Sequence, residues 1–200
     1  YRSEQIKAAH ITGAESIKNW EKFEGYVWVT RIKNSFFGDY NPYKTLVSGD
    51  WFIAYMIAHT GDVFLNEKSM YEVTSLDSVK KPEVFIPSWD QEFSIYTWYT
   101  EQDEKNDETV IYANFQGKNP NEENVEISVR QDCFLPEAEG INYITLSGFK
   151  VSKAATQWAP PTAYQDGMIG PHWSKGWVIE DCEVYESKCS GISLGKYLQP

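Results

Sequence analysis

Alternating apolar and polar residues predict short β-strands along most of the first two thirds of the chain. Residues 26–33 alternate in side-chain character, as a half-buried strand does, and residues 51–57 form an apolar run of strand length. Residues 124–130 place three branched apolar side chains on one face. Six or more such strands with turn signals between them favour a β-sandwich, immunoglobulin-like or jelly-roll-like, at residues 12–139.

Turn signals and a cap motif predict how these strands are connected. Residues 62–65 and 70–73 flank a four-residue loop, which indicates a hairpin. Residues 95–99 and 109–115 have the strand pattern and bracket an acidic turn at residues 101–108. Residues 75–80 predict one short helix, because a serine begins the segment and a proline follows it closely.

The last third of the chain shows a different pattern, an internal repeat. Residues 144–152 align with residues 177–185 at an offset of 33, so that Leu146 matches Ile179 and Val151 matches Val184. Each unit has two inward apolar positions, a kink and a second alternating run. This pattern is typical of one coil of a parallel β-helix.

The repeat also predicts the domain organisation. Residues 155–174 form an insertion, and residues 190–195 fit the next strand of the same coil. We therefore expect an incoming β-helix strand or linker at residues 1–11, the inserted sandwich at residues 12–139 and incomplete coils at residues 140–200. Because two coils bury their apolar faces only against each other, we expect the chain to be a piece of a larger protein.

Charge and cysteine content exclude several classes of function. The net charge of −11 argues against nucleic acid or an anionic membrane as a partner, since both need a basic face. No apolar run reaches the length of a membrane span, and no signal peptide is visible. The three cysteines lack a CxxC pair and the three histidines are scattered, so no metal site is expected.

The aromatic residues gather in two loop regions. Residues 35–52 contain six aromatic side chains, which either pack on the sandwich or project onto a partner, including a second copy of the chain. The insertion contributes Trp158 and Trp173, and rings in a proline-rich loop suit a sugar-stacking wall. Asp166 and His172 would supply contacts to sugar hydroxyls. The alternative is that these rings cover the side of the solenoid.

The sequence contains none of the common catalytic motifs, and one cluster of carboxylates is the remaining candidate for catalysis. There is no GxSxG motif and no phosphate-binding loop. Four carboxylates cluster in the second repeat, and glycoside hydrolysis needs two. They are Glu180, Asp181, Glu183 and Glu186. A pair is geometrically possible there, but a solvated acidic edge is the favoured interpretation, so no catalytic residue is assigned.

Several of these segments together resemble a known family. They are residues 35–43, 59–66, 113–117, 157–161, 169–177 and 187–196. They are similar to the β-xylosidases of glycoside hydrolase family 120, and the likeness covers nearly the whole chain. The resemblance implies a right-handed parallel β-helix with a β-sandwich inserted into an early coil, which agrees with the order of elements predicted above.

The resemblance also implies a function. The family uses a retaining mechanism with an aspartate nucleophile and a glutamate acid/base on later coils, which we expect beyond Pro200, so neither is assigned here. Xylo-oligosaccharides or related glycans are the implied ligands, in the cytoplasm or periplasm of a bacterium. Trp51 resembles a sandwich residue that reaches toward a sugar site. The expected substrate-binding residues are Trp51, Trp158, Asp166, His172 and Trp173. The alternative is a non-catalytic carbohydrate-binding or oligomer-interface module.

Overall fold

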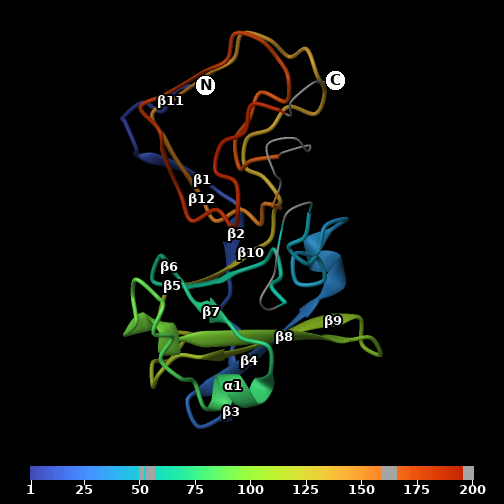
Figure 1. The fold of residues 1–200 in the computed structure, drawn as a ribbon, viewed down its shortest axis with the longest axis vertical. Coiled ribbons are helices and arrows are strands. Elements are labelled where there is room, and N and C mark those ends of the chain that lie inside the picture. The colour runs from blue at the N-terminus through green and yellow to red at the C-terminus, as the bar shows by residue number, and fades with distance from the viewer. Residues whose placement is uncertain (50–51, 53–56, 159–165, 196–200) are drawn as a thin grey trace.

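The computed structural model describes residues 1–49, 52, 57–158 and 166–195, and it shows a stack of coils beside a two-sheet sandwich (Figure 1). The chain leaves the coils between β1 (Ala9–Thr12) and β2 (Ala14–Ser16), and it returns after β10 (Val125–Ser128). The predicted all-β class, a sandwich joined to parallel β-helix coils, is confirmed. Most of the predicted strand at residues 51–57 lies outside the described residues.

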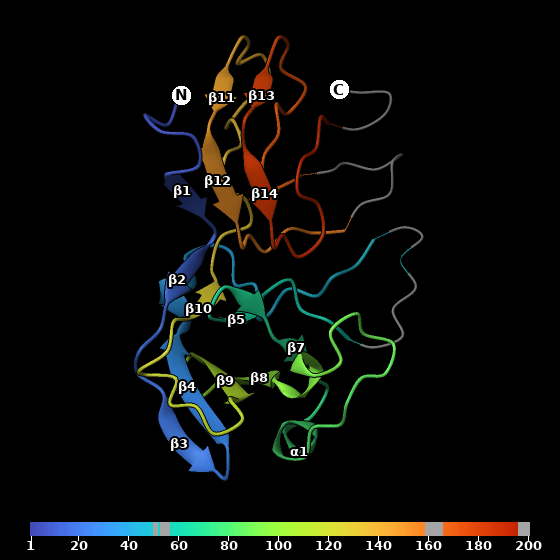
Figure 2. The same cartoon turned by 90° about the vertical axis from the view of Figure 1, so that its left-hand side faces the viewer.

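Two sides of the coil stack are parallel sheets. On the first side β11 (Thr145–Ser147) pairs with β13 (Val178–Glu180), and Arg2 bridges to Ser147. On the second side β12 (Phe149–Ser152) lies between β1 and β14 (Glu183–Tyr185). Figure 2 shows these strands side by side. A third side consists of single parallel bridges that join Phe134, Ile169 and Ile192.

The register of the coils matches the predicted offset of 33. Leu146 pairs with Ile179 and Val151 with Val184, and both Leu146 and Val151 are fully buried. Two details differ from the sequence pattern. The first coil, which begins at Arg2, is additional to the two that the repeat predicts, and Ile169 belongs to the third side although it falls within the predicted insertion. A side only one residue wide leaves no alternation to detect in the sequence.

The sandwich consists of a four-stranded and a five-stranded sheet. The four-stranded sheet is antiparallel and contains, in order, β2, β10, β5 (Val63–Leu65) and β6 (Lys68–Ser69). The five-stranded sheet contains, in order, β3 (Glu21–Glu24), β4 (Val27–Lys33), β9 (Glu108–Asn114), β8 (Thr97–Asp103) and β7 (Tyr71–Glu72). Only the β7–β8 pairing is parallel in this sheet.

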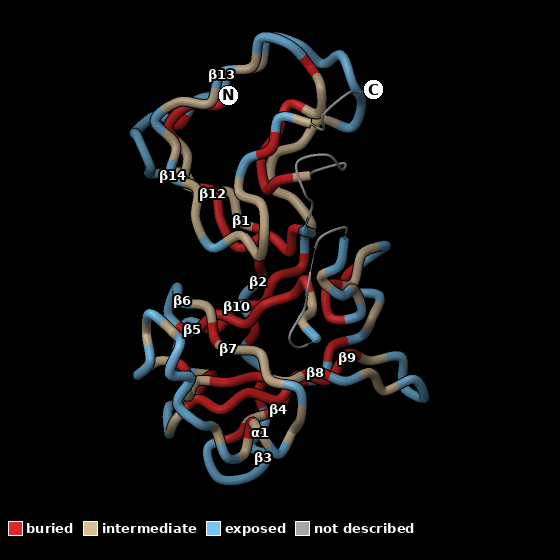
Figure 3. The backbone as a smooth tube through the Cα atoms, viewed as in Figure 1, coloured by how far each residue is buried: buried red, intermediate tan, exposed pale blue. Residues whose placement is uncertain are grey.

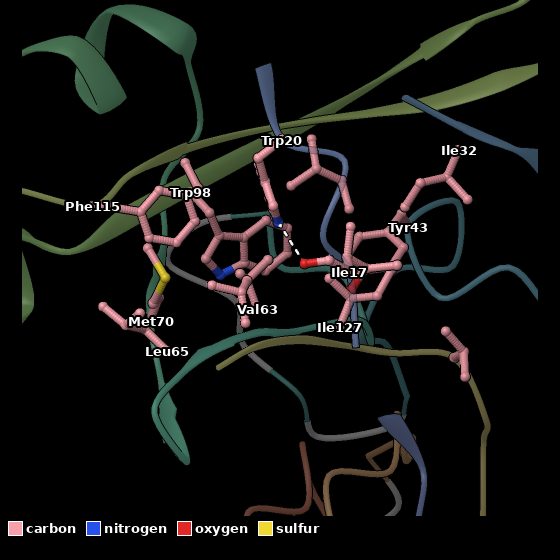
Figure 4. Packing of buried hydrophobic residues seen from close by; sticks show 14 of the residues in the cluster. Ile17, Trp20, Ile32, Tyr43, Val63, Leu65, Met70, Trp98, Phe115 and Ile127 are labelled. Atoms are coloured by element: carbon pink, nitrogen blue, oxygen red, sulfur yellow. Dashed lines mark hydrogen bonds between the residues drawn. The ribbon is translucent and has the colours of Figure 1, made fainter. Parts of the chain in front are cut away.

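The main core lies between the two sheets, where alternate strand residues meet. Trp98, Phe115 and Ile127 are fully buried, and the indole N–H of Trp20 donates to the carbonyl of Ile17 at 3.2 Å (Figure 4). Figure 3 shows most of β4, β5, β9 and β10 as buried and most of the loops around them as exposed. Burial of large apolar side chains is the main favourable term in folding. A smaller cluster lies between the five-stranded sheet and α1 (Leu76–Lys80).

Local signals give mixed results. The helix at α1 is confirmed, and the Ser75 hydroxyl accepts a hydrogen bond from the Ser78 N–H. The predicted four-residue hairpin loop is wrong, because β5 and β6 are joined by Asn66 and Glu67 alone. Both residues have positive φ, as a type I′ turn requires, without the glycine that usually signals it.

The first aromatic loop packs on the sandwich. It includes the 3-10 helix η1 (Asn34–Phe37), and a second 3-10 helix, η2 (Phe93–Ile95), precedes β8. Phe37 and Tyr43 join the main core, whereas Phe36 is half-exposed. The Tyr40 hydroxyl donates to the carbonyl of Ala155, in the coil stack, at 2.7 Å. Phe37, Tyr40 and Tyr43 of this loop therefore pack on the sandwich and the coils, as one of the two alternatives predicts.

Candidate functional site

The site lies where a sandwich loop meets the coil stack. The stem of this loop is a short antiparallel ladder, in which Leu46 bridges to His59 and the Thr60 N–H donates to the carbonyl of Thr45. Gln157 of the coils joins the loop through both ends of its amide. Its Nε2 donates to the Leu46 carbonyl at 2.9 Å, and its Oε1 accepts from the Ser48 N–H at 2.9 Å.

Trp158 is the aromatic residue at this contact. Its backbone N–H donates to Gln157 Oε1, and its ring centre lies 6.1 Å from that of Phe52. Gly49 adopts φ 147°, and a Cβ there would lie 3.0 Å from Trp158 Cδ1. The sandwich loop therefore covers one part of the indole closely, while Trp158 keeps 38% of its surface exposed. Trp51 belongs to the same loop by sequence but lies outside the described residues.

Asp166, His172 and Trp173 form a second group on the coils. Asp166 Oδ1 lies 3.8 Å from His172 Nδ1, and both side chains are mostly buried. The rings of His172 and Trp173 are 4.9 Å apart in an edge-to-face arrangement. Both residues have positive φ, 47° and 60°, a conformation uncommon outside glycine and concentrated at functional sites. The structure thus brings these three predicted residues together.

Asp166 Oδ1 is the most informative atom of this group. It is buried and accepts no hydrogen bond from the residues that the structure describes. A buried carboxylate oxygen without a donor carries a desolvation cost, which a ligand hydroxyl would relieve. The arrangement can therefore receive a hydrogen-bond donor beside an aromatic face.

Asp132 is a neighbour that the sequence pattern did not reveal. Burial raises the pKa of Asp132, and the negative charge of Asp166 raises it further. It precedes Phe134, where the chain re-enters the coil stack after the sandwich. Its proximity to Asp166 depends on the closure of that long insertion, so no local signal in the sequence could have identified it.

Two lysines of the coils form ion pairs with carboxylates of the sandwich. Lys153 Nζ lies 2.7 Å from Glu67 Oε2 and 2.5 Å from Glu126 Oε2, and its side chain is fully buried. Lys188 Nζ lies 3.7 Å from Asp62 Oδ2 and 4.0 Å from Glu72 Oε2. All four carboxylates belong to the sandwich. The sandwich is thus fixed on the coils by ion pairs as well as by the loop contact.

The acidic cluster of the second repeat has a different environment. Glu180 pairs with Arg2 at 3.3 Å, and Glu183 pairs with Lys7 at 3.5 Å, with all four side chains substantially exposed. These contacts join the outside of the last coil to the first. For Glu180 and Glu183 they favour the interpretation as a solvated edge over that of a catalytic pair.

Neither a metal-binding cluster nor a membrane-spanning helix is found in the part of the chain that the structure describes. No group of three or more histidine, cysteine, aspartate or glutamate side chains could hold a metal ion there. Among the same residues, no helix has the length and apolar character of a membrane span.

Comparison with known proteins identifies the family. A family model described as glycoside hydrolase 120, insertion domain, matches residues 17–127. The chain belongs to glycoside hydrolase family 120. A solved structure described as the complex of XylC with xylose is 48% identical to this chain with a TM-score of 0.89. The alignment covers 96% of this chain and 32% of XylC, so the chain spans about a third of its length. No curated protein matches the chain.

These findings confirm the predicted resemblance. The family model falls on the β-sandwich, and the likeness to XylC extends over the coils as well. The relationship of this chain to xylosidase-like members of glycoside hydrolase family 120 is therefore established. The ligand in that structure of XylC is xylose.

Proposed function

We propose that this family 120 chain is part of a hydrolase that acts on xylo-oligosaccharides, and that it supplies walls of the substrate site. The walls are formed by Trp158 and by the group of Asp166, His172 and Trp173, and Trp51 of the sandwich loop completes them. The observation that carries the proposal is Asp166 Oδ1, which is buried next to His172 and Trp173 and receives no hydrogen bond from any described residue. The xylose complex of XylC supports the choice of sugar.

The catalytic carboxylates lie elsewhere in the complete enzyme under this proposal. In a retaining mechanism one carboxylate attacks the anomeric carbon and a carboxylic acid protonates the leaving oxygen, after which water releases the covalent intermediate. Those two groups must lie about 5–5.5 Å apart across the bond. Glu180 and Glu183 are instead committed to ion pairs with the first coil. The reaction uses no metal or cofactor.

The proposed domain limits follow the same scheme. We assign residues 12–139 to the inserted sandwich and residues 1–11 and 140–200 to the β-helix, although Thr12 at one limit and Phe134 near the other pair with residues of the coil stack. The parallel pairing of β1 with β12 supports this division, because it places residues before and after the insertion on one sheet. The insertion point is next to Gly13, whose carbonyl accepts the N–H groups of Val129 and Arg130.

The test combines a binding and an activity measurement on the 200-residue chain. Calorimetric titration with xylotriose should show saturable binding, which Trp158→Ala weakens by about tenfold, or about 1.4 kcal/mol. Trp89→Ala is the matched control, because Trp89 is fully exposed on the sandwich. Nitrophenyl β-xyloside should not be hydrolysed. Equal affinity of the two variants, or turnover by the chain alone, would contradict the proposal.

An oligomer-interface role is the second candidate. The segment from Val84 to Trp89 exposes four large apolar side chains, and such a patch often marks an interaction surface. They are Val84, Phe85, Ile86 and Trp89. Light scattering after size exclusion decides between the candidates, since a dimer that Trp89→Ala dissociates, without sugar affinity, would favour the interface.

A further inference from the structure

The sandwich carries an open pocket of about 470 Å³. It lies beside the stem of the sandwich loop, where Leu46 and His59 form one wall. Glu72 of β7 and Tyr99 of β8 line it from the five-stranded sheet. The pocket includes neither Trp158 nor the group around Asp166, so it is distinct from the walls proposed above.

His59 is held in one orientation in this pocket. Its Nδ1 lies 2.5 Å from Glu72 Oε1, and its backbone N–H donates to Glu72 Oε2 at 2.9 Å. An ionised carboxylate only accepts hydrogen bonds, so Nδ1 carries the hydrogen. In the neutral ring Nε2 is then a free acceptor, and no described residue donates to it. The side chain is 19% exposed, which leaves the ring accessible from the pocket.

Glu72 is itself fixed from the coils. Its side chain is 8% exposed, and Lys188 Nζ lies 4.0 Å from its Oε2. A histidine oriented by a buried carboxylate is the arrangement found where an imidazole must present one nitrogen to a ligand.

The remaining walls combine apolar surface with hydroxyl and amide groups. Leu46 and Ile57 are 43% and 62% exposed, and they provide the apolar part. Tyr99 stacks on Tyr112 at 6.4 Å, and no described residue bonds its hydroxyl. Gln102 is committed to the carbonyl of Tyr43, so it acts as a fixed wall. One fixed acceptor and one free hydroxyl beside apolar side chains suit a ligand with several hydroxyl groups.

We propose that this pocket binds a saccharide unit, with a sugar hydroxyl donating to His59 Nε2 and another bonding the Tyr99 hydroxyl. The pocket is lined by two acidic side chains, Glu72 and Glu104, and by one basic side chain, Lys44, and this excess of negative charge disfavours an anion. The described part of the chain holds no three-residue metal site there. The site is a non-catalytic one on the sandwich and goes beyond the substrate walls proposed for the junction.

The most direct probe is the imidazole itself. Long-range ¹H–¹⁵N spectra of the chain resolve the two ring nitrogens, and xylose or xylotriose should shift His59 Nε2 in a saturable way. His10 is the matched control, because its Nε2 is already 2.7 Å from the Ser152 hydroxyl. A shift with Zn²⁺ alone and none with sugar would overturn the proposal.

Two substitutions at His59 separate its two nitrogens. His59→Asn keeps a donor near Nδ1 for Glu72 but has no atom at Nε2, and it should weaken xylotriose binding at this site by about tenfold, equivalent to one hydrogen bond. His59→Gln places an amide oxygen near Nε2 and should recover part of that loss. Tyr99→Phe removes only a hydroxyl without a described partner, so it keeps the fold and should cost a few-fold in affinity.

The outcomes also distinguish this pocket from the junction walls. Trp158→Ala should leave the His59 shift unchanged, and His59→Asn should leave the Trp158 contact unchanged. If Trp158→Ala abolishes sugar binding and the His59 nitrogen resonances do not shift with sugar, the proposed saccharide site in the pocket is wrong and the proposed function is retained. The reverse result would retain the pocket alone.

Discussion

Lys153→Met removes the buried charge that joins the coils to the sandwich. Lys153 has a fully buried side chain, and its ammonium bonds Glu67 and Glu126 of the sandwich. The ammonium also lies 5.4 Å from the centre of the Phe64 ring. Burial alone would lower the pKa of Lys153, but the bonds to Glu126 and Glu67 outweigh it and raise the pKa. The lysine is therefore charged in the folded protein at neutral pH.

The expected cost follows from what the two carboxylates lose. Removing one partner of a buried ion pair destabilises a protein by about 3–5 kcal/mol, because the other charge stays desolvated. The Glu67 side chain is 56% exposed and returns to water easily, whereas Glu126 is 13% exposed and does not. Glu126 therefore carries most of the desolvation penalty when the lysine is removed. We expect a loss of about 3 kcal/mol in the free energy of unfolding, or about 6–12 °C in melting temperature.

Urea unfolding followed by circular dichroism measures this loss. Lys22→Met on the exposed strand β3 is the matched control and should change stability by less than about 0.5 kcal/mol. A triple variant that adds Glu67→Gln and Glu126→Gln should recover much of the loss, because no unpaired charge remains. A Lys153→Met protein as stable as the Lys22→Met control would refute the reasoning, as would a triple variant no more stable than the single one.

Three further predictions concern backbone contact, thiol reactivity and pH. Gly13→Ala should lower the free energy of unfolding in urea by about 2–3 kcal/mol, because the new Cβ would lie 2.5 Å from Ala154 Cα. In the control Gly25→Ala the new Cβ meets nothing within 4 Å, so only the backbone conformation is disfavoured and the loss should be about 1 kcal/mol. Equal losses in the two variants would contradict this prediction. Burial raises the pKa of the Cys133 thiol to about 12, so iodoacetamide at pH 8 should label it on the order of a thousandfold more slowly than a free peptide thiol, measured by mass spectrometry. Burial raises the pKa of Tyr43 well above 10.0, so the unfolded chain loses the phenolic proton at a lower pH than the folded chain does. The free energy of unfolding should therefore fall above about pH 10, and it should fall less steeply in Tyr43→Phe. A free energy of unfolding that does not change with pH in this range would contradict the prediction.

The coil register was predictable because β-helix coils repeat their inward residues. Leu146 and Ile179 occupy equivalent positions, and burial forces both to be apolar. The third side was not predictable beyond Ile192, because Phe134, Ile169 and Ile192 are unevenly spaced and each contributes a single bridge. Loops of different length between the coils remove the periodicity there.

The candidate site was predictable only where its residues are neighbours in the sequence. His172 and Trp173 are adjacent, and Asp166 is six residues away, so an aromatic and polar loop indicated them. Asp132 and the carboxylates around Lys153 come from segments that the sandwich insertion separates, and only the folded chain brings them together. The turn at Asn66 and Glu67 was not predictable from local sequence either, because both residues adopt a positive φ that their local propensity disfavours. In the folded chain this turn places Glu67 in an ion pair with Lys153 of the coils.

The central claim is that the junction of sandwich and coils binds a sugar. Titration of the chain with xylotriose, followed through its indole ¹H–¹⁵N resonances and assigned with Trp158→Phe and Trp173→Phe, tests it most directly. The account predicts saturable shifts for Trp158 and Trp173, while Trp20 and Trp98 in the sandwich core stay unchanged. Unshifted Trp158 and Trp173 resonances at saturating xylotriose would contradict it.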